Sequence, residues 1–179
     1  MARFRFSVAV GLLVIAPAPV HAAGAPTSLQ NKTITMSWST SGTGTSVTGG
    51  QRAFTNINTR SVYVSTAGRT FLRMQLQSTK KSGAMRSGDV GPNEGGSRGS
   101  VRFEGNRLVG TEVFRSGARQ FIATFDSSFS SCTLNVIDAK SGADEIKRRG
   151  PDGAMYTIGA VTTGSPSCSI QSGNAFAGQ

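Results

Sequence analysis

Histidine is nearly absent from this 179-residue chain. Its single copy, His21, lies in an N-terminal segment that we expect to be removed from the mature protein. A mature chain without histidine lacks the general base of Ser-His-Asp and Cys-His catalysis, and it lacks the imidazole ligands of many zinc sites. We therefore expect no metal site and no cofactor, and the composition favours a non-catalytic protein.

Long apolar runs are also absent. The run over residues 8–16 is far shorter than the roughly 20 residues that a membrane-spanning helix needs. It follows two arginines and precedes small residues that fit a signal-peptidase site after Ala22. The sequence thus predicts a signal peptide over residues 1–22, a single β-rich domain over residues 23–179, and no transmembrane segment in the mature chain. Because the signal is short and of bacterial type, we expect a periplasmic or secreted bacterial protein.

Acidic residues are scarce, since 9 Asp and Glu stand against 19 Lys and Arg, for a net charge of +10 at pH 7. Such an excess favours anionic partners, namely acidic polysaccharide, lipopolysaccharide or a membrane surface, although it also serves solubility alone. The basic clusters contain no interleaved aromatic residue of the kind that stacks on bases, so we do not expect a nucleic-acid partner. The candidate anion-binding residues are Lys80, Lys81, Arg86, Arg98, Lys147, Arg148 and Arg149.

The chain has only two cysteines, Cys132 and Cys168, and they allow a single pairing. Cysteines of exported proteins tend to be oxidised, which favours a Cys132–Cys168 disulfide over a redox or metal site. Neither residue belongs to a C-x-x-C motif. Loop-closure entropy predicts a contribution of about 3–4 kcal/mol from this bond.

Alternation of apolar and polar residues dominates the rest of the chain, and no segment has a convincing helical period. In "KTITMSW" the side chains of Ile34, Met36 and Trp38 share one face of a predicted strand. "QFIATF" is apolar on both faces, as in a central strand, and "CTLNVID" directs Cys132 toward the core. Many short strands joined by turn-forming segments predict an all-β fold, a single antiparallel meander that forms a β-barrel or a β-sandwich with one disulfide.

The sequence makes separate predictions for residues 78–100 and for the segment near the C-terminus. Residues 78–100 are rich in Gly, Ser and charge and predict a long mobile loop, which is either functional or a tolerated insertion. Near the C-terminus we expect one strand through Tyr156 and Ile158 and a separate last strand, "PSCSIQS", that the disulfide ties to residues 132–138.

Paired carboxylates are the remaining catalytic option, because glycoside hydrolysis needs two of them in one cleft. The candidates are Glu104, Glu112, Asp126 and Asp138. Glu112 is notable because it lies in the middle of "LVGTEVF". Charged strand residues usually face water, so we expect each of these carboxylates to lie on a solvated face.

From "FDSSFSSCTLNVI" to "SPSCSIQSGNAFAG" the chain resembles small exported proteins of proteobacteria that carry no assigned function. These proteins share a signal peptide, a β-rich body and two late cysteines in Ser-Cys contexts. The resemblance covers the C-terminal third best and implies no activity. The chain also resembles lipocalin-type and avidin-type barrels in having its single tryptophan early in the first predicted strand. Its "MSWST" lacks the G-x-W motif of lipocalins.

Three functional hypotheses follow from these observations. The first is a non-catalytic binding or structural module of the bacterial envelope or extracellular space. The second is an electrostatic binder of acidic polysaccharide or lipopolysaccharide. The third is a carboxylate-dependent glycan hydrolase, which requires two acidic side chains to converge.

Overall fold

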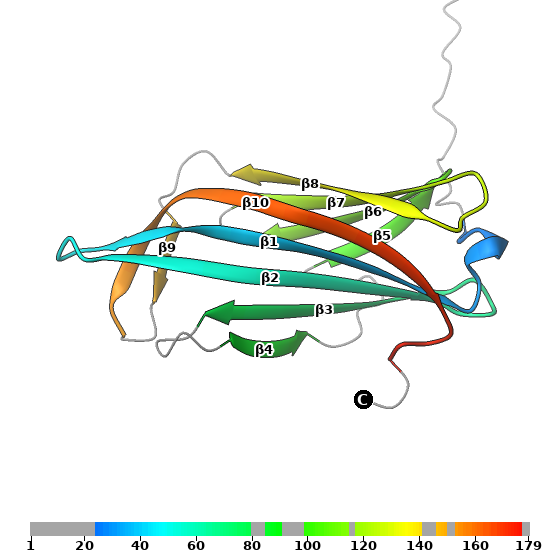
Figure 1. Ribbon diagram of the computed structural model, residues 1–179, viewed down its shortest axis with the longest axis horizontal. Coiled ribbons are helices and arrows are strands. Elements are labelled where there is room, and N and C mark those ends of the chain that lie inside the picture. Colours follow the sequence, from blue (N-terminus) through cyan, green and yellow to red (C-terminus); the bar gives the residue numbers. More distant parts are fainter. Residues whose placement is uncertain are drawn as a thin grey trace, which may run out of the picture.

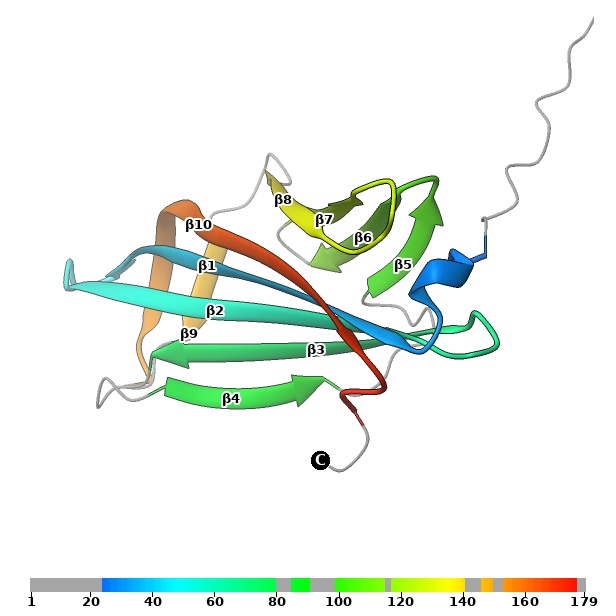
Figure 2. The same cartoon turned by 45° about the vertical axis from the view of Figure 1, so that its right-hand side comes forward.

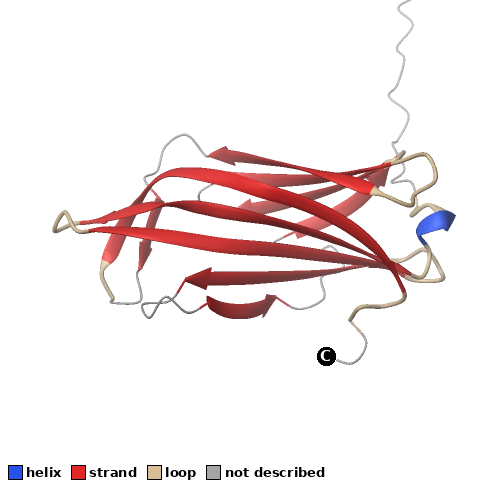
Figure 3. Cartoon of the chain, viewed as in Figure 1, coloured by secondary structure: helices blue, strands red, loops and turns tan. Residues whose placement is uncertain are grey.

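The chain is built almost entirely from β-strands (Figure 1; Figure 3). The computed structural model describes residues 24–79, 85–90, 99–114, 117–140, 146–149 and 153–176, so the predicted signal peptide lies outside the described residues. A short 3-10 helix, η1 (Thr27–Leu29), precedes the strands. The strands are β1 (Lys32–Ser46), β2 (Gln51–Val64), β3 (Thr70–Thr79), β4 (Met85–Val90), β5 (Gly99–Glu104), β6 (Arg107–Phe114), β7 (Gly117–Phe125), β8 (Cys132–Lys140), β9 (Ile146–Arg149) and β10 (Met155–Ser172).

The strands form two antiparallel sheets that face each other (Figure 2). One has six strands in the order β4-β3-β2-β1-β10-β9, and the other has four in the order β5-β6-β7-β8. The all-β prediction is confirmed. Among the described strands neither order closes on itself, so the architecture is a sandwich. The predicted meander holds for β1 to β4 and for β5 to β8, whereas β10 returns to pair with β1.

The core lies between the inner faces of the two sheets. Ile34, Met36 and Trp38 are buried side by side on β1, as the alternation predicts. Phe121 of β7 meets Trp38 from the opposite sheet, with ring centroids 5.9 Å apart. β7 is flanked by β6 and β8, so the prediction of a central strand from "QFIATF" is also confirmed. Each sheet covers the apolar face of the other, and this burial drives the pairing.

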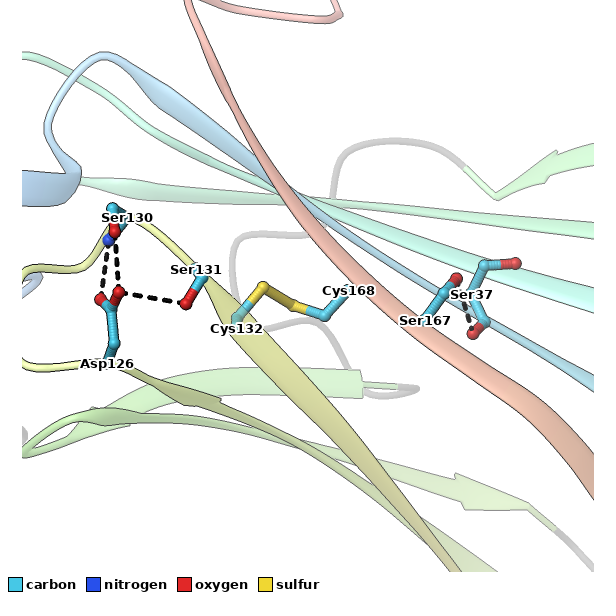
Figure 4. Close-up of a disulfide and its surroundings, with 7 residues drawn as sticks. All are labelled: Ser37, Asp126, Ser130, Ser131, Cys132, Ser167 and Cys168. Carbon is cyan, nitrogen blue, oxygen red and sulfur yellow. Dashed lines mark hydrogen bonds between the residues drawn. A yellow bond between two sulfur atoms is a disulfide. The ribbon is translucent and has the colours of Figure 1, made fainter.

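A disulfide joins the two sheets at one edge (Figure 4). Cys132 begins β8 and Cys168 lies in β10, and their Cα atoms are 5.6 Å apart. β9 pairs only with the first residues of β10, so β1 is the one sheet neighbour that β10 has near Cys168 among the described strands. The predicted bond is therefore confirmed, and it closes a seam between two strand edges that belong to different sheets.

Two expectations about chain segments need correction. β4 lies within the predicted loop 78–100 and pairs with β3, because an edge strand needs only backbone hydrogen bonds and little apolar surface. Residues 80–84 and 91–98 lie outside the described part of the chain. The two strands predicted near the C-terminus form one long strand, β10, whose register against β1 shifts at two points instead of breaking.

Gly110 provides a test of the inter-sheet packing. It stands opposite Phe121, and a Cβ on Gly110 would lie 1.9 Å from the Phe121 ring. We expect Gly110→Ala to lower the free energy of unfolding by about 1–3 kcal/mol, because the ring must move away from Trp38. Urea unfolding followed by Trp38 fluorescence measures this change. Gly24→Ala is the control, since a Cβ there meets no atom within 4 Å. Equal midpoints for the two variants would contradict the packing described.

Candidate functional site: a charge cluster between the sheets

Four charged residues meet between the two sheets, and we call them the inter-sheet charge cluster: Arg60, Glu112, Arg119 and Asp138. Arg60 lies on β2 of the six-stranded sheet. The other three stand opposite one another on the neighbouring strands β6, β7 and β8. Directly opposed residues project from the same face of a sheet, so this row of charges points toward β2.

Arg60 and Glu112 form the buried centre of the cluster. The Arg60 Nε and Nη2 atoms donate to the two carboxylate oxygens of Glu112, the second bond at 3.1 Å. Its Nη1 atom donates to the backbone carbonyls of Thr59 at 2.9 Å and Gln75 at 3.1 Å. The side chains are only 7% and 1% exposed. A buried ion pair is tolerated when its hydrogen bonds are satisfied in this way, and the two-point contact fixes the orientation of both groups.

Arg119 extends the cluster from the interior to the seam between β8 and β10. Its Nε atom donates to Asp138 Oδ1 at 2.6 Å, and its Nη1 atom lies 3.9 Å from Glu112 Oε2. The Thr163 hydroxyl of β10 donates to the other Asp138 oxygen at 3.1 Å. Asp138 is 35% exposed, so the positive and negative groups alternate from a dry centre to a wetter edge.

Trp38 packs beneath both arginines. The guanidinium carbons of Arg60 and Arg119 lie 5.2 and 5.5 Å from the centroid of its ring. Such cation–π contacts stabilise a desolvated arginine. The indole Nε1 atom is buried and has no hydrogen-bond partner among the described residues. Because Trp38 is the only tryptophan of the chain, its fluorescence reports directly on this cluster.

The four predicted carboxylates do not gather in one cleft. Glu112 is buried, so the expectation that it faces water is wrong. Arg60, the residue that makes its burial tolerable, lies 52 positions earlier in the chain. Asp138 shares the cluster, but Arg119 binds it. Glu104 pairs with Arg102 on the exposed surface of β5 at 2.6 Å.

Asp126 lies in the turn between β7 and β8. It accepts hydrogen bonds from the Ser130 hydroxyl at 2.7 Å, the Ser130 backbone N–H at 2.8 Å and the Ser131 hydroxyl at 3.0 Å (Figure 4). These bonds, that of the Ser130 hydroxyl above all, hold the pKa of Asp126 well below its usual range. The carboxylate is committed to shaping the turn that leads into Cys132.

The predicted anion-binding residues fall into separate places. Lys80, Lys81 and Arg98 lie outside the described residues. Arg86 lies on β4, at one edge of the six-stranded sheet, and residues 147–149 lie on β9, at the other end of the strand order. Strand pairing therefore does not join Arg86 to the β9 cations.

A second group of arginines and aromatic rings was missed by the sequence reasoning. On the outer face of the six-stranded sheet Tyr63 stacks on Phe71 and meets Phe176 edge to face. Arg69 lies over Phe71, and Arg73 lies over Phe176. We call these five residues the outer-face cluster. The spacing of "RTFLR" was the available signal, because residues 69, 71 and 73 alternate onto one face.

Comparison with known proteins adds no relative: no family model, curated protein or solved structure matches this chain. In the part of the chain that the structure describes, no helix is long and apolar enough to cross a membrane. Within the same residues, no group of three or more His, Cys, Asp or Glu side chains could hold a metal ion.

The buried pair can be tested by a double-mutant cycle. We expect Glu112→Leu and Arg60→Met each to cost about 3–5 kcal/mol of unfolding free energy, because each leaves one buried charge alone. The double variant should recover most of this loss, since it removes both charges of the pair and leaves neither without its partner. Urea unfolding followed by Trp38 fluorescence gives the three values. A double variant as unstable as the sum of the two singles would contradict this account.

The Asp126 turn predicts a specific pH dependence. The folded-state pKa lies below the unfolded value of about 3.9, so the stabilisation is complete above that value and is lost as the pH falls toward the folded-state pKa. We expect Asp126→Asn to lose less stability than the wild type between about pH 5 and pH 2, because its side chain cannot ionise. Urea midpoints across this range measure the effect, with Glu104→Gln as a control for an exposed carboxylate. Parallel curves for the wild type and Asp126→Asn would show that the turn does not depend on this charge.

Proposed function

We propose that this protein is an exported, non-catalytic β-sandwich module of the bacterial envelope or extracellular space, and that it binds an anionic polymer such as acidic polysaccharide or lipopolysaccharide. One observation carries the proposal. Each carboxylate whose side chain the structure describes is already engaged: Glu112 and Asp138 within the inter-sheet charge cluster, Glu104 with Arg102, and Asp126 in its turn. Without Arg3 and Arg5 of the predicted signal peptide the chain has 17 Lys and Arg against 9 Asp and Glu, so cations remain in excess of carboxylates in the mature protein.

Export is supported by the disulfide and by the predicted signal peptide. Disulfides persist in oxidising compartments, and the Cys132–Cys168 bond is of the kind that fastens a small secreted domain. A surface rich in cations in such a compartment meets acidic glycans and the phosphate groups of lipopolysaccharide. We therefore propose that the anionic polymer binds at the surface of the sandwich and that the interior charge cluster serves to stabilise the fold.

The hydrolase alternative receives less support from the same contacts. Glycoside hydrolysis needs one carboxyl group that donates a proton and a second that acts as base or nucleophile. Arg60 engages both oxygens of Glu112, and Arg119 and Thr163 engage those of Asp138. The carboxylate oxygens of Glu112 and Asp138 thus bind other side chains of the protein, which does not favour a role for them in cleaving a glycosidic bond.

The proposed function is tested by binding at varied ionic strength. We expect the mature protein to be retained on immobilised heparin and to bind lipopolysaccharide at low salt. Retention should fall steeply as salt shortens the screening length from about 30 Å at 0.01 M to about 10 Å at 0.1 M. An uncharged dextran column is the control. Absence of retention, or retention that salt does not change, would remove the proposal.

A further inference from the structure

One end of the inter-sheet core contains a hydrogen-bond donor that the surrounding side chains do not satisfy. The indole Nε1 atom of Trp38 has no hydrogen-bond partner among the described residues, and the residue is only 1% exposed. Buried N–H groups are almost always bonded, because an unmade bond leaves the full desolvation cost of the donor uncompensated. The Trp38 donor therefore requires an acceptor other than the described groups of the protein.

The polar groups nearest to Trp38 are buried, yet their contacts are long. Asn58 stands opposite Trp38 on β2. Its amide nitrogen donates to Thr40 Oγ1 and its amide oxygen accepts from Arg119 Nη1, both at 3.4 Å. Arg119 Nη1 also lies 3.9 Å from Glu112 Oε2. All three distances exceed the usual range of about 2.7–3.2 Å for such bonds, so these side chains are spaced too widely to satisfy one another fully.

We propose that this polar end of the core binds one internal water molecule, which accepts a hydrogen bond from Trp38 Nε1 and donates to Glu112 Oε2 and Asn58 Oδ1. Buried waters make about three hydrogen bonds, typically to groups that the protein leaves unsatisfied. Glu112 Oε2 accepts one bond from Arg60 Nη2 at 3.1 Å, and a carboxylate oxygen has a second lone pair to offer. The Asn58 amide oxygen likewise has a second lone pair beside its long contact with Arg119.

The charge of the surroundings favours water over an ion. The inter-sheet charge cluster holds two arginines and two carboxylates, so its formal charges cancel. An added anion would lie beside Glu112, and an added cation would lie beside Arg60 and Arg119, so either would bury an uncompensated charge. Water is neutral and can both accept from the indole and donate to the two oxygens. An apolar site of the same size would stay dry, whereas polar side chains supply the partners here.

The bonds of this water cross from one sheet to the other. Trp38 and Asn58 lie on the six-stranded sheet, and Glu112 lies on the four-stranded sheet. A bridging water is nearly as favourable as a direct hydrogen bond, so groups that are too far apart for direct bonds still hold the sheets together. The site is separate from the surface to which we assign the anionic polymer, and it goes beyond that function.

The indole proton of Trp38 tests the proposal directly in the full mature protein. Its signal needs no assignment by mutation, because Trp38 is the only tryptophan of the chain. In an isotope-labelled sample we expect a nuclear Overhauser effect between this proton and water, with the sign given by a water that tumbles with the protein. No effect, or an effect with the sign of freely diffusing water, would overturn the proposal.

Two matched variants show whether the signal comes from this site. Asn58→Leu removes one acceptor and fills its place with methyl groups, so the effect between water and the indole proton should be lost. Asn135→Leu makes the same change at an exposed position of β8 and should leave the effect at its wild-type intensity. Urea midpoints establish that both variants are folded. Persistence of the effect in Asn58→Leu, or its loss in Asn135→Leu, would show that no water is bound as proposed.

Discussion

A carboxylate buried between two sheets is costly unless a cation reaches it, and in this protein Arg60 reaches Glu112 from the opposite sheet. The pair therefore does more than neutralise a charge. A sideways shift of either sheet would separate the two groups and leave each of them desolvated and unpaired. The contact thus selects one relative position of the sheets, whereas the surrounding apolar side chains would accept several.

The disulfide constrains the same assembly from its edge. β8 carries Cys132 at its start and Asp138 near its end, and both residues bind β10 across the seam. These two contacts lie on one strand edge and join two described strands, β8 and β10, that are not paired through their backbones. Because Asp138 also binds Arg119, the covalent and electrostatic constraints converge on β8. Loss of either constraint is expected to loosen the seam before it affects the remote hairpin of β2 and β3.

Local alternation predicted the apolar strands of the two sheets, but it did not predict β4 or the contacts between the sheets. The sequence places Trp38 on an apolar face and leaves one pairing for Cys132, so these features follow from short-range pattern and from the scarcity of cysteine. The burial of Glu112 could not be predicted from the sequence. Alternation assigns its side chain to one face of a strand but does not show that Arg60 of the other sheet lies opposite to it. β4 was missed for a different reason, because its pairing at a sheet edge uses backbone groups that every residue carries.

Glycine in the interior of a strand costs about 0.5–1 kcal/mol relative to alanine, so its position calls for a physical reason. At Gly110 the reason is the Phe121 ring, which is fully buried because Trp38 covers it from the other sheet. Gly42 is covered by Phe54 in the same manner, yet no second sheet completes the packing. A Cβ on Gly42 would lie 2.9 Å from the Phe54 ring and 2.9 Å from the Ala160 carbonyl oxygen. Close packing over the backbone therefore requires glycine at both positions, and the difference lies only in how deeply the covering ring is buried.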